Sequence, residues 1–199
     1  MEFFFCVGNM RRVKQRVIIQ VKWSKPPEGW FKLNSDGASC GNPGKARGGG
    51  LIRDCNGNWV KGFSRSIGFA TSFTTELWAL RDGLKLVLNA RIQSLVVELD
   101  AKVVADLLTT NGVTNKPYSP LLPDCRCLLR RFLRVQVVHV YREGNRCTDV
   151  LARWGSNMNE DFAVFDSPPS PEILCFVNMD IAGMYIDRIS ESGPTISVG

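Results

Sequence analysis

The segment 31–44 constrains the fold of this chain more than any other. Phe31 and Leu33 alternate with polar residues, which is the period-two pattern of a β-strand with one buried face. The glycine-rich run 37–44 follows, and we expect it to stop the strand and to let a ligand approach the backbone closely. Asp36 would then end a strand beside an open turn. A carboxylate there can bind a metal ion or simply form the turn, and this segment alone favours the turn.

Strand patterns continue after this run. A second strand is expected over residues 48–54 and a third from Trp59, joined by the hairpin turn that Asn56-Gly57 favours. The glycines at 48–50 indicate either a bulge or a surface against which something packs. The chain from residue 30 to residue 63 therefore predicts three consecutive antiparallel strands.

The apolar period changes to that of a helix after Ser72, where Leu77, Leu80 and Leu84 share one face. Thr74 or Thr75 can cap the start of this helix. Later segments alternate between the two types, with strands over 95–100 and 135–141 and helices near 103–108, 128–133 and 145–158. Strands that return after helices require crossover connections, so the order predicts an α/β fold with a partly parallel, mixed sheet.

The two ends of the chain carry little regular pattern. We predict a basic, poorly ordered leader over residues 1–28, one folded domain over 29–158 and an irregular tail over 159–199. The prolines at 26–27 and the run Asp166-Ser167-Pro168-Pro169 motivate these boundaries, because proline interrupts helices and strands.

Composition narrows the classes of partner. The formal net charge of +6 and the pI of about 9.1 favour an anionic partner such as nucleic acid. No apolar run approaches the ~20 residues that cross a bilayer, so no membrane partner is expected. The seven cysteines lack zinc-site spacing, and the single histidine excludes a histidine-rich metal site. We therefore expect reduced thiols and an intracellular monomer, in either nucleus or cytoplasm.

Four carboxylates occupy definable places in this pattern. Asp36 and Asp100 end strands, Glu76 opens the first long helix and Asp149 lies in the last helix. Glu76 has an alternative explanation, since a carboxylate in a first turn is favoured by the unpaired helix amides. Strand ends and helix starts meet at one edge of such a sheet, and four like charges gathered there would need bound cations. Mg²⁺ prefers oxygen ligands, and two such ions can orient a water and stabilise the leaving oxygen of a phosphodiester.

These carboxylates lie in motifs that occur in a fixed order: Asp36-Gly37-Ala38 with Gly41-Asn42-Pro43-Gly44, Thr75-Glu76-Leu77, Leu99-Asp100-Ala101, and the run 143–153. Over residues 29 to 156 the chain resembles the type 1 ribonuclease H family, and most of all its retroelement-derived, reverse-transcriptase-like branch common in plants. The resemblance implies an α/β, RNase H-like fold. Its five-stranded mixed sheet, with three antiparallel strands and then parallel strands, would be flanked by helices.

The same resemblance implies a divalent-metal-dependent endoribonuclease that cleaves the RNA strand of RNA–DNA hybrids. Asp36, Glu76, Asp100 and Asp149 would be its catalytic, metal-binding residues, holding two Mg²⁺ ions or Mn²⁺ in their place. Glu76 would also contact the ribose 2′-hydroxyl, which distinguishes RNA from DNA. The substrate-binding residues would be Gly37, Ser39, Asn42 and Asn145.

The chain departs from the family pattern in three places, the first of which is Ser72-Phe73-Thr74-Thr75, where some members place asparagines just before the catalytic glutamate. The loop Tyr141-Arg142-Glu143-Gly144 carries no histidine, and whether Arg142 or Glu143 replaces it stays open; His139 is interpreted as a strand residue. Residues 111–123 are too short and irregular for the basic helix with which many members grip the hybrid. Arg126, Arg130 and Arg134 could compensate if one helix carried all three, because i, i+4, i+8 positions share a side.

Two other functions fit the same motifs. The departures suit a catalytically weak or inactive, retroelement-derived nucleic-acid-binding module with the same fold, although such a module has no reason to keep four clustered carboxylates. An integrase or resolvase of the same fold is less favoured, because of the Gly41-Asn42-Pro43-Gly44 turn and the context of Glu76.

Overall fold

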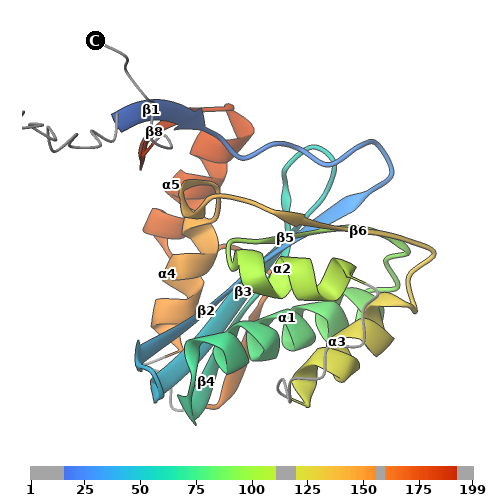
Figure 1. Cartoon of the computed structure of the whole chain (residues 1–199). Helices are drawn as coiled ribbons and strands as arrows, with labels where there is room; N and C mark the ends of the chain where they lie inside the picture. Colours follow the sequence, from blue (N-terminus) through green and yellow to red (C-terminus); the bar gives the residue numbers. More distant parts are fainter. Residues whose placement is uncertain (1–15, 111–119, 156–159, 192–199) are drawn as a thin grey trace, which may run out of the picture.

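The computed structural model describes residues 16–110, 120–155 and 160–191, and its centre is a six-stranded mixed sheet (Figure 1). The strand order is β6-β5-β2-β3-β4-β7, with β5 and β6 parallel to β2 and all other pairs antiparallel. The strands are β2 (Phe31–Gly41), β3 (Gly44–Arg53), β4 (Trp59–Ala70), β5 (Ser94–Leu99), β6 (Arg134–His139) and β7 (Phe162–Phe165). The predicted α/β fold is confirmed, and β7 adds a sixth strand to the five expected.

Helices cover both faces of this sheet. They are α1 (Ser72–Asn89), α2 (Lys102–Thr109), α3 (Leu121–Leu129), α4 (Arg146–Trp154) and α5 (Pro171–Ile181), with a 3₁₀ turn η1 (Arg142–Gly144) before α4. The larger apolar core lies between the sheet and α1, α2 and α3, and a smaller one lies under α4 and α5. None of the described helices combines the length and the apolar character that crossing a bilayer requires.

The strand β2 does not stop at Asp36, as the glycine-rich run suggested, but continues to Gly41. Gly37 pairs with Gly48 across the sheet, so the glycines extend the ladder instead of ending it. A Cβ on Gly37 would lie 2.4 Å from the backbone of Thr75 and Glu76, so the close neighbour is helix α1. Asp36 therefore lies in the middle of a central strand, where it pairs with Gly49 of β3 just beyond the last residue of β2 that pairs with β5.

The glycines of β3 let a helix approach each face of the sheet. A Cβ on Gly49 would lie 2.4 Å from Ala152 in α4, and one on Gly48 would touch Ala79 in α1. Neighbouring strand residues point to opposite faces, so α1 and α4 must cover opposite sides. Helices thus pack against Gly48 and Gly49, whereas a Cβ on Gly50 would lie 2.2 Å from the ring of Phe63 on β4.

Helix α1 begins earlier than predicted. Thr71, not Thr74 or Thr75, caps it by accepting a hydrogen bond from the Thr74 amide at 3.2 Å. Glu76 is therefore beyond the first turn, which holds no acidic residue. The alternative explanation of Glu76, as a carboxylate that satisfies free helix amides, no longer applies.

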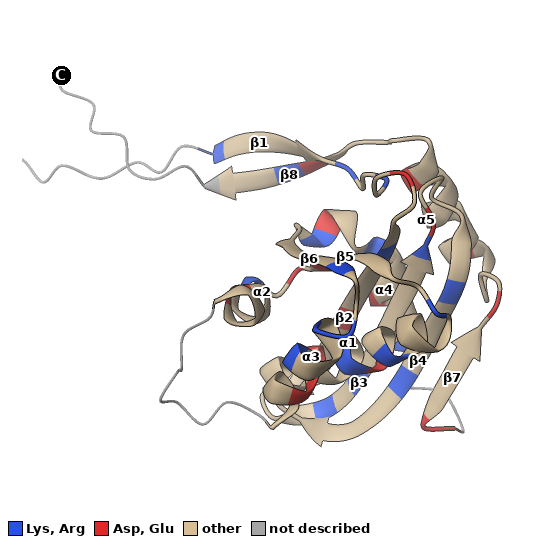
Figure 2. Ribbon diagram, turned by 90° about the vertical axis from the view of Figure 1, so that its right-hand side faces the viewer, with Lys and Arg blue, Asp and Glu red and all other residues tan. Residues whose placement is uncertain are grey.

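The C-terminal part of the chain is not irregular over residues 160–191. It contains β7, α5 and β8 (Ile186–Glu191), and β8 pairs with β1 (Arg16–Val21) in a separate two-stranded ribbon. Figure 2 shows this ribbon projecting from the body of the domain. The prediction of an irregular tail is wrong because these elements depend on partners far away in the sequence: β7 pairs with β4, and β8 pairs with β1, inside the predicted leader. The basic residues 11–14 lie outside the described residues.

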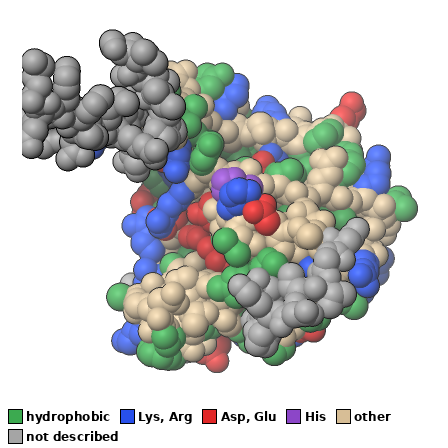
Figure 3. Space-filling model, in the orientation of Figure 1, with side chains coloured by type: hydrophobic (Ala, Val, Ile, Leu, Met, Phe, Trp, Pro, Cys, Tyr) green, Lys and Arg blue, Asp and Glu red, His purple; other side chains and the backbone are tan. Residues whose placement is uncertain are grey.

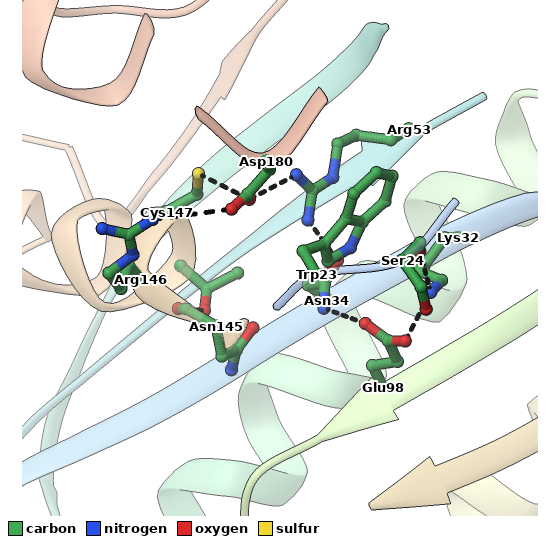
Figure 4. A network of polar contacts seen from close by, with 11 residues as sticks. Trp23, Ser24, Lys32, Asn34, Arg53, Glu98, Asn145, Arg146, Cys147 and Asp180 are labelled. Carbon is green, nitrogen blue, oxygen red and sulfur yellow. Dashed lines mark hydrogen bonds and ion pairs between the residues drawn. The ribbon is translucent and has the colours of Figure 1, made fainter. Parts of the chain in front are cut away.

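A buried polar network joins Trp23 and Asp180, which lie on either side of the central part of the chain, to the sheet (Figure 4). Asn34 on β2 accepts hydrogen bonds at Oδ1 from Trp23 Nε1 at 3.2 Å and Arg53 Nη2 at 2.9 Å. Arg53 Nη1 in turn donates to Asp180 Oδ2 on α5 at 2.7 Å, and its guanidinium lies 3.6 Å from the Trp23 ring centroid. Trp23 and Asp180, both outside the domain predicted over residues 29–158, are therefore built into its core.

The other half of the network neutralises a buried carboxylate. Asn34 Nδ2 donates to Glu98 Oε2 on β5 at 2.8 Å, and Lys32 forms an ion pair with the second oxygen. Burial lowers the pKa of Lys32, while Glu98 acts in the opposite direction. Because breaking one partner would leave an unpaired buried charge, this network favours one arrangement of β2, β3, β5 and α5.

Candidate active site

Three carboxylates from three elements converge beside the middle of β2. Each of Asp36, Glu76 and Asp100 offers one carboxylate oxygen, and the three oxygens lie within 4.8 Å of one another. Asp36 comes from β2, Glu76 from α1, and Asp100 directly follows the neighbouring parallel strand β5. Figure 3 shows acidic side chains reaching the surface beside the histidine, with basic side chains close by.

The glycine after Asp36 fixes the position of Glu76. The Gly37 amide donates to Glu76 Oε2 at 3.1 Å, across the gap that only a glycine leaves open for α1. Gly37 is thus a scaffold residue in this structure, and its predicted role in substrate binding stays a prediction. The close approach of β2 and α1 brings two carboxylates together that lie 40 positions apart in the sequence.

Crowding shifts the protonation of all three acids. Burial, followed by the charges of Asp100 and Asp149, raises the pKa of Asp36 to about 7. Burial and the charge of Asp36 raise the pKa of Glu76 well above its usual value, and burial is also the main reason that the pKa of Asp100 is raised. Such shifts mark a place where negative charge is concentrated without a matching internal cation.

The donor set fits a hard divalent cation. Asp36 Oδ2 and Asp100 Oδ1 are buried and accept no hydrogen bond from the described residues. Buried carboxylate oxygens otherwise find donors, so the two orphaned atoms point to a ligand that supplies positive charge. Oxygen-only ligands at close spacing are the type that Mg²⁺ and Mn²⁺ accept.

Asp149 lies on α4 near this cluster but outside the group of three. Its Oδ1 accepts a hydrogen bond from Arg142 Nη2 at 2.7 Å, and Arg153 Nη2 lies 3.4 Å from Oδ2. The hydrogen bond and the charge of Asp149 raise the pKa of Arg142, whose own charge lowers the pKa values of Asp36 and Asp100. The loop that lacks a histidine therefore delivers a guanidinium to the fourth carboxylate.

The predicted substrate residues of the β2–β3 hairpin are tied to the start of α1. Ser39 Oγ lies 2.9 Å from Ser72 Oγ, and Asn42 Oδ1 accepts a hydrogen bond from the Ser72 amide at 3.1 Å. Both contacts are exposed, so Ser39 and Asn42 remain accessible to a ligand. Ser72 was not among the predicted site residues. Its position just ahead of a helical period was the signal that could have identified it.

Asn145 is buried, with 2% of its surface exposed, and its Nδ2 donates to the Ser35 carbonyl at 3.1 Å. This bond fixes the start of α4, and with it Asp149, against β2 next to Asp36. So buried a side chain offers little surface to a substrate, and the contact with substrate predicted for Asn145 stays a prediction.

His139 and the arginines complete the comparison with the sequence. His139 ends β6, as interpreted from the sequence, and its ring meets Tyr141 edge-on at 5.8 Å. Arg126 lies in α3 and Arg130 caps it, but Arg134 begins β6, so no single helix carries all three. The conditional prediction of a phosphate-tracking helix face is wrong because α3 ends at Leu129. Most of the loop 111–123 lies outside the described residues.

Comparison with known proteins identifies similar domains. The family model described as Reverse transcriptase-like matches residues 34–155. A curated Arabidopsis thaliana protein, named "Putative ribonuclease H protein", is 39% identical over 154 residues, which cover 77% of this chain and 25% of that protein. The chain thus spans about a quarter of the length of the curated relative that it matches.

Solved structures share the fold. RNase H1 from Halobacterium salinarum is 30% identical with a TM-score of 0.59, and covers 64% of this chain and 98% of its own. The RNase H domain of Rv2228c from Mycobacterium tuberculosis is 25% identical with a TM-score of 0.61, over 64% and 94% of the two chains. LC11-RNase H1, solved in complex with an RNA/DNA hybrid, is 24% identical with a TM-score of 0.56, which is a likeness of fold.

Proposed function

The chain belongs to the reverse transcriptase-like family of ribonuclease H domains, and from this premise we propose that it cleaves the RNA strand of RNA–DNA hybrids. The reaction would be a divalent-metal-dependent hydrolysis of phosphodiester bonds. The observation that carries the proposal is the cluster of Asp36, Glu76 and Asp100, with two buried oxygens that no described donor satisfies.

The residues would divide the work as follows. Asp36, Glu76 and Asp100 would hold Mg²⁺, and Asp149 would contribute a fourth carboxylate from α4. Bound Mg²⁺ would supply an activated water and charge stabilisation for the leaving oxygen. The β2 backbone keeps Asp36 fixed, and the Gly37 amide orients Glu76, so these acids need little rearrangement on binding. Ser39 and Asn42 are exposed on the hairpin, where they can contact the nucleic-acid backbone.

The second candidate is a nucleic-acid-binding domain with weak or no turnover. The specific observation in its favour is the ion pair between Arg142 and Asp149 at 2.7 Å, which engages the fourth carboxylate. This domain would bind the same hybrid and leave it intact.

One assay separates the two functions. A labelled RNA–DNA hybrid is incubated with the full chain in Mg²⁺, in Mn²⁺ and in EDTA, with single-stranded RNA and double-stranded DNA as controls. We expect metal-dependent cleavage of the RNA strand of the hybrid alone, and none by Asp36→Asn. Binding of the hybrid without cleavage in either metal would favour the second candidate, and cleavage that persists in EDTA would contradict the first.

A further inference from the structure

A groove separates the β1–β8 ribbon from the end of β6. Its volume is about 430 Å³, and its walls are residues 19–24 at the end of β1 and just after it, residues 139–141 at the end of β6 and just after it, and Tyr185 before β8. Figures 1 and 2 both show the ribbon lying across from β5 and β6. Residues near both ends of the described chain therefore contribute to this groove.

The groove continues the face of the sheet that carries the acidic cluster. Glu98 lines the groove, and Asp100 follows two positions later, so their side chains leave β5 on the same side. His139 lines it as well and is close enough to lower the pKa of Asp100. Tyr141 directly precedes Arg142, the partner of Asp149. A strand that leaves the acidic cluster on this side would enter the groove.

The groove offers aromatic rings together with positive charge. Tyr185 is 54% exposed and Tyr141 42% exposed. Lys22 Nζ lies 4.6 Å from the Tyr185 ring centroid, and the Arg188 guanidinium lies 4.5 Å from that of Tyr141. A ring that stacks on bases, next to a cation such as Lys22 that can neutralise a phosphate, is the combination found in single-strand binding sites, whereas Arg188 is already paired with Glu143. The carboxylate of Glu98 in the wall is already neutralised by Lys32.

The groove is held in place before any ligand arrives. Trp23 in its wall is buried in the polar network, where it donates to Asn34. Arg188 donates to both oxygens of Glu143, at 3.0 and 2.9 Å, and so links the ribbon to the turn η1. Such preorganisation lowers the cost of ordering the wall on binding.

We propose that this groove binds unpaired nucleotides of a single strand that extends from the substrate. The identity of the substrate as a hybrid rests on the proposed function, whereas the preference for an unpaired strand rests on Tyr185 and Lys22. The protein would then favour hybrids that end in a single-stranded overhang.

The test measures binding without cleavage. The affinity of the full chain is compared by fluorescence anisotropy in EDTA for a blunt hybrid and for hybrids with DNA or RNA overhangs on either strand. We expect at least one overhang to tighten binding about tenfold, and Tyr185→Ala and Lys22→Glu each to remove most of that gain. The arms with DNA and RNA overhangs identify which strand is bound.

Matched variants keep the test specific. Tyr185→Phe retains the ring and should keep the gain, and Lys25→Ala removes an exposed lysine three positions from Lys22 without touching the groove. Circular dichroism and thermal melting establish that each variant is folded. Equal affinity for blunt and overhanging hybrids would overturn the proposal. An equal loss of affinity for both kinds of hybrid in Tyr185→Ala would also overturn it. This second outcome is the one expected if the groove binds a peptide. An overhang preference in a protein that cleaves nothing would support the groove and contradict the proposed function.

Discussion

Two charged sites lie side by side on β2 and β5, and they are built in opposite ways. Asn34 and Glu98 are register partners in the buried network, and Asp36 and Asp100 follow each of them by two residues on the same face. In the network each charge has a counter-charge, Lys32 for Glu98 and Asp180 for Arg53. In the cluster, carboxylate oxygens are buried without donors and their pKa values are raised.

The difference separates charge that supports the fold from charge that supports chemistry. A buried ion pair that loses one partner leaves an uncompensated charge, so the network should be sensitive to substitution in its stability. The acidic cluster already carries uncompensated charge. Neutralising one of its acids should therefore increase the stability of the fold and at the same time remove activity. Four measurements test this contrast.

The largest effect is expected for Asp36→Asn. The amide keeps the shape but cannot bind a metal ion as a carboxylate does, so hybrid cleavage in Mg²⁺ should fall by about a hundredfold or more. The melting temperature in EDTA at pH 8 should rise, because burial and two neighbouring acids disfavour the ionised form. Wild-type activity in this variant would rule out the proposed metal site. A lower melting temperature would contradict the view that the acidic cluster, unlike the buried network, destabilises the fold.

Asp180→Ala should show the reverse pattern. Arg53 would be left buried without its carboxylate partner. The free energy of unfolding in urea should therefore fall by about 3 kcal/mol. Activity per folded molecule should change little. Asp166→Ala is the matched control, because its ion pair with Lys61 is exposed and such pairs contribute less than about 1 kcal/mol. Equal losses in the two variants would show that the network has no special role.

The pH dependence of stability should follow from the raised acids. The folded pKa of Asp36, at about 7, exceeds its unfolded value of about 3.9, so the folded state binds more protons between these pH values. The contribution is fully favourable below pH 4 and is lost as the pH rises through 7. The melting temperature in EDTA should therefore fall between pH 5 and pH 8 more in the wild type than in Asp36→Asn. Added Mg²⁺ should reduce this fall at pH 8.

The smallest effect is expected for Arg142→Ala. Its side chain is 68% exposed, but its cation competes with a metal ion for Asp149. The Mg²⁺ concentration that gives half-maximal cleavage should decrease by a few-fold, since surface ion pairs contribute less than about 1 kcal/mol. Arg153→Ala, which removes a longer contact to the same carboxylate, should shift it less. An equal shift of the half-maximal Mg²⁺ concentration in the two variants would indicate that the total positive charge near Asp149 matters, and not its specific pair with Arg142.

Much of the fold could be predicted because its signals are local. The alternation at Phe31 and Leu33, the Asn56-Gly57 turn and the helical period from Leu77 each depend on a few neighbouring residues, and the corresponding β2, hairpin and α1 are present. The elements β7, α5 and β8 escaped prediction because they are stabilised by distant partners. The strand β8, for example, depends on β1 at the other end of the chain.

The site was predictable in part for the same reason. Asp36, Glu76 and Asp100 could be placed at one edge once strands and helices had been assigned, and the structure brings them together; their catalytic roles stay a prediction. The pairing of Arg142 with Asp149 depends on the path of η1, and the burial of Asn145 depends on its bond to Ser35. Neither the pairing of Arg142 nor the burial of Asn145 produces a periodic pattern in the sequence from which it could be predicted.

The position of Trp23 and Asp180 has a practical consequence. A fragment trimmed to residues 34–155, the span shared with the family, would lose the indole against which Arg53 rests and the carboxylate that neutralises it. A piece that can be expected to express as a stable protein therefore reaches at least from Trp23 to Asp180, well beyond the boundaries that homology alone would suggest.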